Sequence, residues 1–243
     1  MARVPRVFCD ATLASGAVAE LPATAAHHVT RVLRLKPGGT LILFDDSGKE
    51  YRGELLDASR RSPKVRVLDA GTREPDPVLA IHLILGVSRG QRMDYALQKA
   101  TELGVTEITP VITRRSVVRL QDDKREQRQA HWRHILIHAC EQSGRCRLPV
   151  LHPPVDFSER PAIPGQAGVL LDPLSDQTLV DLDPPSGALA LLVGPEGGLS
   201  EQERQAALDE GFTGVRLGPR ILRTETAPLA AIAAVQVLWG DFR

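Results

Sequence analysis

Two glycine-rich breaks in the last fifty residues constrain this chain more than any other feature. An apolar run, Leu189–Val193, ends in the loop Gly194–Gly198, and a second apolar-edged run, Val215–Leu217, ends in Gly218–Arg220. Both breaks are typical of a strand that ends in a loop, and ligands in open α/β sheets bind at the carboxyl ends of strands. Glycine also lets backbone N–H groups approach a ligand without interference from a Cβ. The two loops are therefore predicted to form two walls of one pocket.

Two patterns of hydrophobicity divide the chain. Residues 1–72 hold short alternating runs with tight turns, such as Thr40–Phe44 and Lys64–Leu68, which predict a small barrel or curled sheet. The polar, proline-bearing stretch Ala70–Pro77 is the expected domain boundary. Beyond it, apolar strands such as Leu79–Leu85 alternate with amphipathic helices, which indicates βαβ units and a parallel sheet. The prediction is an α/β fold with a small β domain over 1–72 and an α/β domain over 76–243.

The sequence argues against a membrane-spanning protein and against a fold held together by disulfides. The 243 residues contain no apolar run near the roughly 20 residues that a membrane helix needs, and no apolar signal segment follows Met1. Cys9, Cys140 and Cys146 make an odd count without Cys-x-x-Cys spacing, which argues against a disulfide framework. We therefore expect a cytoplasmic protein with no membrane partner.

The net charge of zero conceals an uneven distribution. Residues 1–147 hold 24 Lys and Arg against 17 Asp and Glu, whereas residues 148–243 hold 6 against 13. A basic first part favours contact with a polyanion. Ordinary solvated surfaces are an alternative that charge alone leaves equally open.

Several standard sites are missing from the sequence. There is no Gly-x-x-x-x-Gly-Lys-Ser/Thr loop, no Gly-x-Gly-x-x-Gly and no Gly-x-Ser-x-Gly nucleophile elbow. His131, His134 and His138 share one side of a predicted helix, but their spacing matches no usual zinc pattern and a carboxylate partner is absent. No metal site is predicted.

The two glycine loops carry the charged side chains of the predicted pocket. Glu196 stands alone on a turn that otherwise exposes backbone, and Arg223 and Glu225 precede a nearly all-apolar helix that starts near Thr226. Each loop also has a purely structural interpretation. The first is a tight turn with Glu196 in solvent, and the second is a helix start at which Glu225 favours the positive end of the helix dipole.

A known family shares both loops. Gly194–Glu203 reads GPEGGLSEQE and Leu217–Ala227 reads LGPRILRTETA. This pairing resembles the RsmE family, the ribosomal small-subunit RNA (uracil-N3)-methyltransferases of the SPOUT class. Further matching segments are Pro5-Arg6, Arg31–Arg34, Ser88–Gly90, Lys99–Val105 and Glu141–Arg145.

The resemblance implies a fold, a cofactor and partners. It implies a PUA-like, RNA-binding first domain and a SPOUT domain whose parallel sheet is followed by a trefoil knot at about residues 189–238. S-adenosylmethionine would sit in the knot of each subunit of a homodimer. The implied reaction is methylation of N3 of a specific uridine in the 16S rRNA of the small ribosomal subunit.

The resemblance also implies site residues. The cofactor would contact Leu171, Leu192, Gly194, Glu196, Gly197, Gly198, Leu217, Gly218, Ile221, Leu222, Arg223 and Ala227. From the chemistry of the transfer rather than from the resemblance, we expect Arg223 to face a uracil carbonyl oxygen and stabilise negative charge, and Glu196 or Glu225 to remove the N3 proton. Glu196 is favoured because its loop leaves it free to face the ligand, and Glu225 is alternatively a salt-bridge partner of Arg223. RNA would contact Arg6, Arg31, Arg34, Arg89, Arg92 and Arg145.

Two other functions compete with this one. A ribose 2′-O-methyltransferase of the same class would need no base for a ring nitrogen, although the loop over residues 217–227 argues against it. A non-catalytic RNA-binding factor for ribosome assembly would keep the basic first part of the chain, but would have no use for a glycine-lined cofactor loop.

Overall fold

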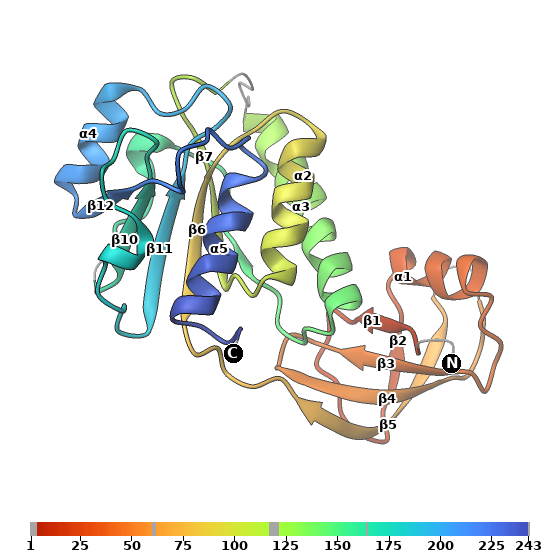
Figure 1. Ribbon diagram of the computed structural model, residues 1–243. Coiled ribbons are helices and arrows are strands. Elements are labelled where there is room, and N and C mark those ends of the chain that lie inside the picture. Colours follow the sequence, from red (N-terminus) through yellow and green to blue (C-terminus); the bar gives the residue numbers. More distant parts are fainter. Residues whose placement is uncertain (1–3, 60–61, 117–121, 164, 243) are drawn as a thin grey trace. The chain divides into compact units, whose positions relative to one another are not determined.

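The computed structural model describes residues 4–59, 62–116, 122–163 and 165–242 (Figure 1). The chain divides into two compact units. Unit 1 comprises residues 1–76 and 137–148, and unit 2 comprises residues 77–136 and 149–243. The first unit therefore includes a segment distant in sequence, which is the end of one long helix and the loop that follows it.

Unit 1 is built on a curled five-stranded sheet. Its order is β1-β3-β4-β5-β2, with β1 parallel to β3 and the other pairs antiparallel. Its elements are β1 (Arg6–Phe8), β2 (Val18–Glu20), α1 (Ala23–His27), the π-helix η1 (His28–Val32), β3 (Thr40–Phe44), β4 (Lys49–Leu55) and β5 (Lys64–Arg73). The predicted small, curled β unit is confirmed.

Alternating side chains of these strands form the core of unit 1. Leu41 and Leu43 of β3, Leu55 of β4, and Val65 and Val67 of β5 are fully buried on one face. Period-two alternation places such residues on the same side of a sheet. Strand β5 continues to Arg73, so the expected linker begins later than its composition indicates; Lys49 of β4 pairs with Arg73 and extends the ladder.

Arg6 joins three segments inside unit 1. Its guanidinium lies 2.5 Å from a carboxylate oxygen of Glu50 and donates to the backbone carbonyls of Gly144 and Arg145 at 3.0 and 3.1 Å. The Arg6 side chain is 9% exposed. Burial raises the pKa of Glu50, but the hydrogen bonds and charge of Arg6, together with Thr72, hold that pKa below its usual value. Arg6 is thus occupied by the fold rather than presented to a ligand.

We expect Arg6→Ala to destabilise the protein by about 2–3 kcal/mol, because it leaves the Glu50 carboxylate partly buried without its cation. Urea unfolding at neutral pH measures this. Arg31→Ala, at an exposed position, is the matched control and should change the free energy of unfolding by less than about 0.5 kcal/mol. Equal effects of the two substitutions would contradict the role of Arg6.

Unit 2 contains a parallel sheet in the order β12-β10-β11-β6-β7-β8, and β9 also pairs with β7. The strands are β6 (Ala80–Gly86), β7 (Glu107–Ile112), β8 (Val150–Leu151), β9 (Val155–Asp156), β10 (Ala167–Leu171), β11 (Ala188–Val193) and β12 (Phe212–Val215). Strands β6 and β11 are buried along almost their whole length, as their continuous apolar sequences predict. The predicted α/β domain with a parallel sheet is confirmed.

Helices connect these strands. They are α2 (Gln91–Glu102), α3 (Asp122–Ser143), α4 (Glu201–Asp209) and α5 (Ala227–Leu238), with short 3₁₀ turns η2 (Phe157–Glu159) and η3 (Leu179–Asp181). Helices α2 and α5 lie side by side (Figure 1). None of the helices in the described ranges combines the length and the hydropathy that crossing a bilayer requires.

Helix α5 is exposed mainly at its C-terminal end. Ala231, Ile232 and Val235 are fully buried, whereas Val237 is 58% exposed and Leu238 is 36% exposed. The nearly all-apolar sequence of α5 predicts burial on most sides, and nine of its twelve residues are buried or half-buried. The strand order does not test the trefoil knot expected at about residues 189–238, so the knot stays a prediction.

Candidate active site

A cavity of about 780 Å³ lies in unit 2 at the carboxyl ends of β10, β11 and β12. Its walls belong to the loops that follow these strands and include residues 172–174, 194–196, 198–199, 216–218 and 220–225. Parallel strands bring their carboxyl ends to the same edge of a sheet. The two glycine loops singled out in the sequence therefore do face one space.

Most of the residues expected to contact the cofactor line this cavity. They are Leu171, Gly194, Glu196, Gly198, Leu217, Gly218, Ile221, Leu222, Arg223 and Ala227. Two expected residues do not line it. The Leu192 side chain is fully buried in the core of unit 2, and Gly197 packs against Arg115, whose Cβ would lie 2.9 Å from a Cβ added at Gly197.

Buried hydroxyl groups hold the loops together behind the cavity. The Thr224 hydroxyl donates to the backbone carbonyl of Gly194 at 3.3 Å and lies 3.0 Å from the hydroxyl of Ser88. These contacts join the loop after β12 to the loops after β11 and β6. The walls of the cavity are thereby fixed relative to one another.

Glu196 is bound to the segment that follows β6. One carboxylate oxygen, Oε1, accepts two hydrogen bonds. The backbone N–H of Arg89 donates the first at 3.0 Å, and the Arg92 guanidinium donates the second at 3.3 Å. Burial raises the pKa of Glu196, but these hydrogen bonds and the charge of Arg92 hold it below its ordinary value. The expectation that Glu196 is free to face a ligand is therefore not met, although its second oxygen, Oε2, is buried without a hydrogen-bond partner in the described part of the chain.

Glu225 pairs with Arg92 rather than with Arg223. Its carboxylate oxygen Oε2 lies 4.0 Å from Nε of Arg92 and, among the described residues, has no hydrogen-bond partner. Arg223 is exposed in the cavity wall. Its backbone carbonyl accepts the N–H groups of Thr226 and Ala227 at 2.9 Å, which anchors the start of α5. The salt bridge expected between Glu225 and Arg223 is replaced by a link from Glu225 to α2.

A partly buried ion pair at the cavity was not predicted from the sequence. Asp172 directly follows β10, is 5% exposed and accepts from Nε of Arg204 at 2.6 Å. Arg115, another missed lining residue, donates to the carbonyl of Gly197 at 3.3 Å. Asp172 had a readable signal, since it is the first polar residue after a buried strand. Arg115 and Arg204 had none, because they reach the cavity from distant segments.

The arginines expected to bind RNA fall into two groups. Arg31 and Arg34 in unit 1, and Arg89 and Arg92 in unit 2, are exposed. Arg6 and Arg145 are mostly covered within unit 1: Arg145 is 14% exposed and lies 3.6 Å from Glu74. We therefore remove Arg6 and Arg145 from the proposed RNA contacts, because their charges are already paired.

The lowered pKa of Glu196 makes its contribution to stability depend on pH. A carboxyl whose pKa is lower in the folded state stabilises the fold above its unfolded pKa, about 4.3, and loses that effect as the pH falls through the folded pKa. Because the site is partly open to solvent, we expect Glu196→Gln to cost only about 1 kcal/mol at pH 7. The difference from wild type should shrink as the pH falls below about 4.3.

Denaturant unfolding over a series of pH values measures this difference. The matched control is Glu201→Gln, at a 73% exposed side chain on the same cavity, which should change the free energy of unfolding by less than about 0.5 kcal/mol. A Glu196→Gln penalty that stayed constant down to acid pH would show that the charge of Glu196 does not stabilise the loop.

S-adenosylmethionine, which the resemblance implies, fits this cavity. The volume lies within the range of about 300–1,000 Å³ typical of small-molecule sites. Leu171, Leu217 and Leu222 offer apolar contacts for a flat base. Glu196 and Glu225 each have a buried carboxylate oxygen without a hydrogen-bond partner among the described residues, which suits a ligand that carries positive charge.

Comparison with protein families gives two matches. A family described as an RNA methyltransferase domain matches residues 74–236, and one described as an RNA methyltransferase PUA domain matches residues 21–68. The first match contains every wall of the cavity, and the second lies in unit 1.

Comparison with individual proteins extends the similarity over the whole chain. The crystal structure of a ribosomal RNA small subunit methyltransferase E from Neisseria gonorrhoeae bound to S-adenosyl methionine is 41% identical, with a TM-score of 0.90, and the match covers 99% of this chain and 100% of that chain. A Legionella pneumophila protein described as a methyltransferase, in complex with the same cofactor, is 35% identical with a TM-score of 0.93 over 99% and 100% of the two chains. The ribosomal RNA small subunit methyltransferase E of Buchnera aphidicola (subsp. Schizaphis graminum) is 30% identical over 242 residues, 98% of each chain.

Proposed function

The chain belongs to the family of ribosomal RNA small subunit methyltransferase E, and from that membership we propose that it methylates N3 of a specific uridine in 16S rRNA. It is an S-adenosylmethionine-dependent enzyme that acts on the RNA of the small ribosomal subunit. The observation that carries the proposal is the cavity formed by both glycine loops at the carboxyl ends of β10, β11 and β12. We place this activity in the cytoplasm, where small subunits are assembled.

We assign RNA binding to unit 1 and cofactor binding to unit 2. Unit 1 contains the PUA domain, whose exposed Arg31 and Arg34 would contact RNA phosphates. Unit 2 would hold the cofactor in the cavity, and the substrate strand would be guided by Arg92, which lines the cavity, and by the exposed Arg89, whose backbone N–H binds Glu196. A uridine in folded RNA must already be exposed, or must be turned out of its stack, to enter such a site.

Uracil N3 must lose its proton before it can form a bond to the methyl carbon; the carbon–sulfur bond of the cofactor would break, and S-adenosylhomocysteine would be the leaving group. When bound, S-adenosylmethionine supplies the methyl group on a positively charged sulfur. Loss of the N3 proton spreads negative charge onto the neighbouring carbonyl oxygens of the base. A guanidinium aimed at one of these oxygens would stabilise that charge, and we assign this role to Arg223, which is exposed in the cavity wall.

Glu225 is our preferred base. Glu196 already accepts hydrogen bonds from Arg89 and Arg92 that stabilise its ionised form, and a lowered pKa makes a carboxylate a weaker base. Glu225 has the longer contact to Arg92, 4.0 Å. Glu196 would instead hold the cofactor loop against the segment after β6. A Glu196→Gln enzyme that keeps full turnover would remove Glu196 from the chemistry and leave Glu225 as the candidate.

We propose that two chains form a homodimer through α2 and α5. These helices lie side by side and carry the exposed apolar side chains of Tyr95 on α2, and of Val237 and Leu238 on α5. Burial of exposed apolar side chains is a common basis of subunit association. Light scattering of the purified protein would measure a mass twice that of the chain, and Val237→Glu would shift it to the monomer value.

Methyl transfer to ribosomal subunits tests the proposed function. Labelled S-adenosylmethionine would be incubated with small subunits that lack N3-methyluridine, and the labelled nucleoside would be identified. N3-methyluridine is the expected product. Label on a ribose oxygen would identify a 2′-O-methyltransferase instead, and a protein that binds no cofactor would be a non-catalytic assembly factor.

A further inference from the structure

Three potential metal ligands meet on one face of the unit 2 sheet, near the amino ends of β6 and β7. His82 of β6 is in register with Glu107 of β7, and Glu107 is in register with Val150 of β8. His152 follows Val150 by two residues, which returns its side chain to the same face as Glu107. The cofactor cavity lies at the opposite, carboxyl ends of the strands, so this cluster is separate from it.

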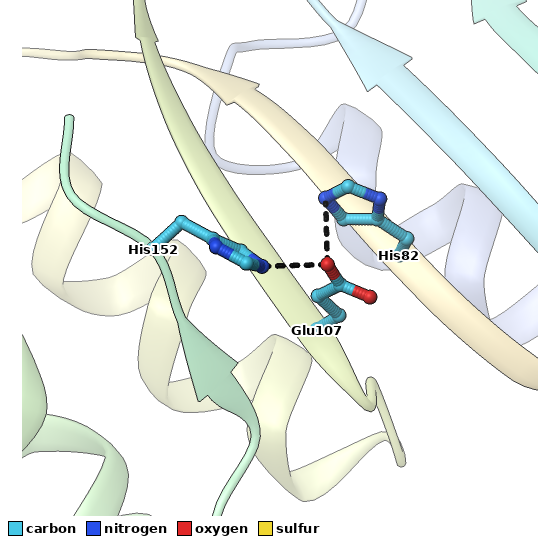
Figure 2. Close-up of side chains that lie close together, drawn as sticks. All are labelled: His82, Glu107 and His152. Atoms are coloured by element: carbon cyan, nitrogen blue, oxygen red, sulfur yellow. Dashed lines mark hydrogen bonds and ion pairs between the residues drawn. The ribbon is translucent and has the colours of Figure 1, made fainter. Parts of the chain in front are cut away.

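The potential metal-ligand atoms of the three side chains lie close together (Figure 2). One oxygen of Glu107, Oε1, lies 2.5 Å from Nε2 of His152 and 3.8 Å from Nε2 of His82. All three potential ligand atoms lie within 4.8 Å of one another. His82 is 4% exposed, whereas the side chains of Glu107 and His152 are 34% and 37% exposed. A solvent ion could therefore reach the cluster past Glu107 and His152.

We propose that His82, Glu107 and His152 bind one divalent transition-metal ion, with Zn²⁺ the best match. Zinc takes imidazole nitrogen and carboxylate oxygen at about 2.0–2.2 Å, and a site with three protein ligands keeps its fourth position for water. Ligand atoms around a tetrahedral ion are then about 3.3–3.5 Å apart. The separations of the two imidazole nitrogens from Glu107 Oε1, 2.5 and 3.8 Å, bracket this range, and these nitrogens lie within 4.8 Å of each other, so shifts of about an ångström would complete the geometry.

The ligand types determine which ion fits. Two imidazoles favour zinc and its neighbours in the transition series, whereas magnesium and calcium prefer a full set of oxygen ligands. Thr109, whose hydroxyl lies 2.8 Å from Nε2 of His82, holds that ring in place and gives up this contact when the ion binds. The sequence predicted no metal site because these three residues lie 25 and 45 positions apart and share no short motif.

The bound ion would fasten a weakly attached segment. Strand β8 contributes only two residue pairs to the sheet, Glu107 with Val150 and Ile108 with Leu151. An ion held by His82, Glu107 and His152 would tie β6, β7 and the segment after β8 together. Because binding to the folded state stabilises it, zinc would raise the melting temperature of the protein.

Zinc titration of the untagged, chelator-treated full chain tests the proposal. We expect calorimetry to show one equivalent of bound Zn²⁺ per chain, and about 0.1 mM ZnCl₂ to raise the melting temperature. Co²⁺ in the same site should give the strong visible absorption of tetrahedral coordination, which needs no variant. No stoichiometric zinc binding, or a cobalt spectrum like that of the hydrated ion, would overturn the proposal.

A pair of variants locates the ion. His152→Gln removes a ligand from a partly exposed position and should weaken zinc binding by about tenfold or more. His131→Gln is the matched control, since His131 forms a single exposed pair with Asp94 at 3.1 Å, and should leave zinc binding unchanged. Unchanged binding in a folded His152→Gln protein, verified by circular dichroism, would place the ion elsewhere and refute the site.

Discussion

Arg223→Ala should lower kcat for methyl transfer by about 10²–10³-fold while leaving the fold intact. Removal of one preorganised donor to a developing negative charge costs this much in other enzymes. The substitution keeps the backbone carbonyl that anchors α5, because Thr226 and Ala227 bind the main chain of Arg223. The loss should therefore come from the guanidinium alone.

Single-turnover kinetics with labelled cofactor and small subunits measure this effect. Calorimetric titration with S-adenosylmethionine would show whether cofactor affinity also falls. We expect most of the loss in kcat, because the negative charge on uracil exists only once the N3 proton leaves. Arg223→Lys should recover part of the rate, because the lysine ammonium keeps the positive charge but lacks the planar guanidinium.

Arg220→Ala is the matched control for Arg223→Ala. Arg220 is an exposed arginine on the same loop and cavity, so its removal changes the local charge equally. It should affect KM for RNA rather than kcat. If both alanine variants lowered kcat equally, general electrostatics would explain the result, and the assignment of Arg223 to the uracil oxygen would be wrong.

The strand ends that build the site could be predicted from the sequence. Leu189–Val193 matches β11, whereas the run Val215–Leu217 marks only the end of β12, which stops at Val215; glycine follows each run. Parallel sheets then require both loops to lie at one edge. The local patterns are thus enough to predict the cavity, because the loops that follow parallel strands all lie at the same edge of the sheet.

The partners of the charged groups could not be predicted in this way. Glu196 binds Arg89 and Arg92, more than 100 residues earlier in the chain; burial raises the pKa of Glu196, and these contacts help to hold it below its ordinary value. The ion pair of Asp172 and Arg204 likewise depends on how α4 packs against β12, the neighbour of β10 in the sheet. Such pairs follow from tertiary packing, which leaves no periodic signal in the sequence.

Gly86→Ala should have the second large effect, a loss of cofactor affinity by about tenfold or more together with a destabilisation of about 1–3 kcal/mol. Gly86 is the last residue of β6, and the Gly194-Pro195 backbone passes directly over it. A Cβ at this position would clash with N of Pro195, and would lie 2.5 Å from its Cδ and 2.8 Å from the carbonyl carbon of Gly194. Backbone and a proline ring cannot rotate away as a flexible side chain can.

The only relief for such a clash is movement of the whole loop. That loop carries Glu196, and it is also tied to Thr224 through the carbonyl of Gly194. Displacing it would separate the walls of the cavity and misplace the backbone groups proposed to hold the cofactor. Affinity for S-adenosylmethionine, measured by calorimetry, should therefore fall more than the loss of stability alone would require.

Gly214→Ala is the matched control, because it adds the same methyl group to a strand of the same sheet. Among the residues that the structure describes, the nearest atoms to a Cβ on Gly214 lie 3.6 Å away, an ordinary contact with Asp172 and Ser175. With no clash and fewer unfolded conformations, Gly214→Ala should leave stability unchanged or raise it by up to about 1 kcal/mol, and it should bind the cofactor normally. If Gly86→Ala behaved like Gly214→Ala, the loop over β6 would be able to shift without consequence, and its close approach to Gly86 would not be what shapes the site.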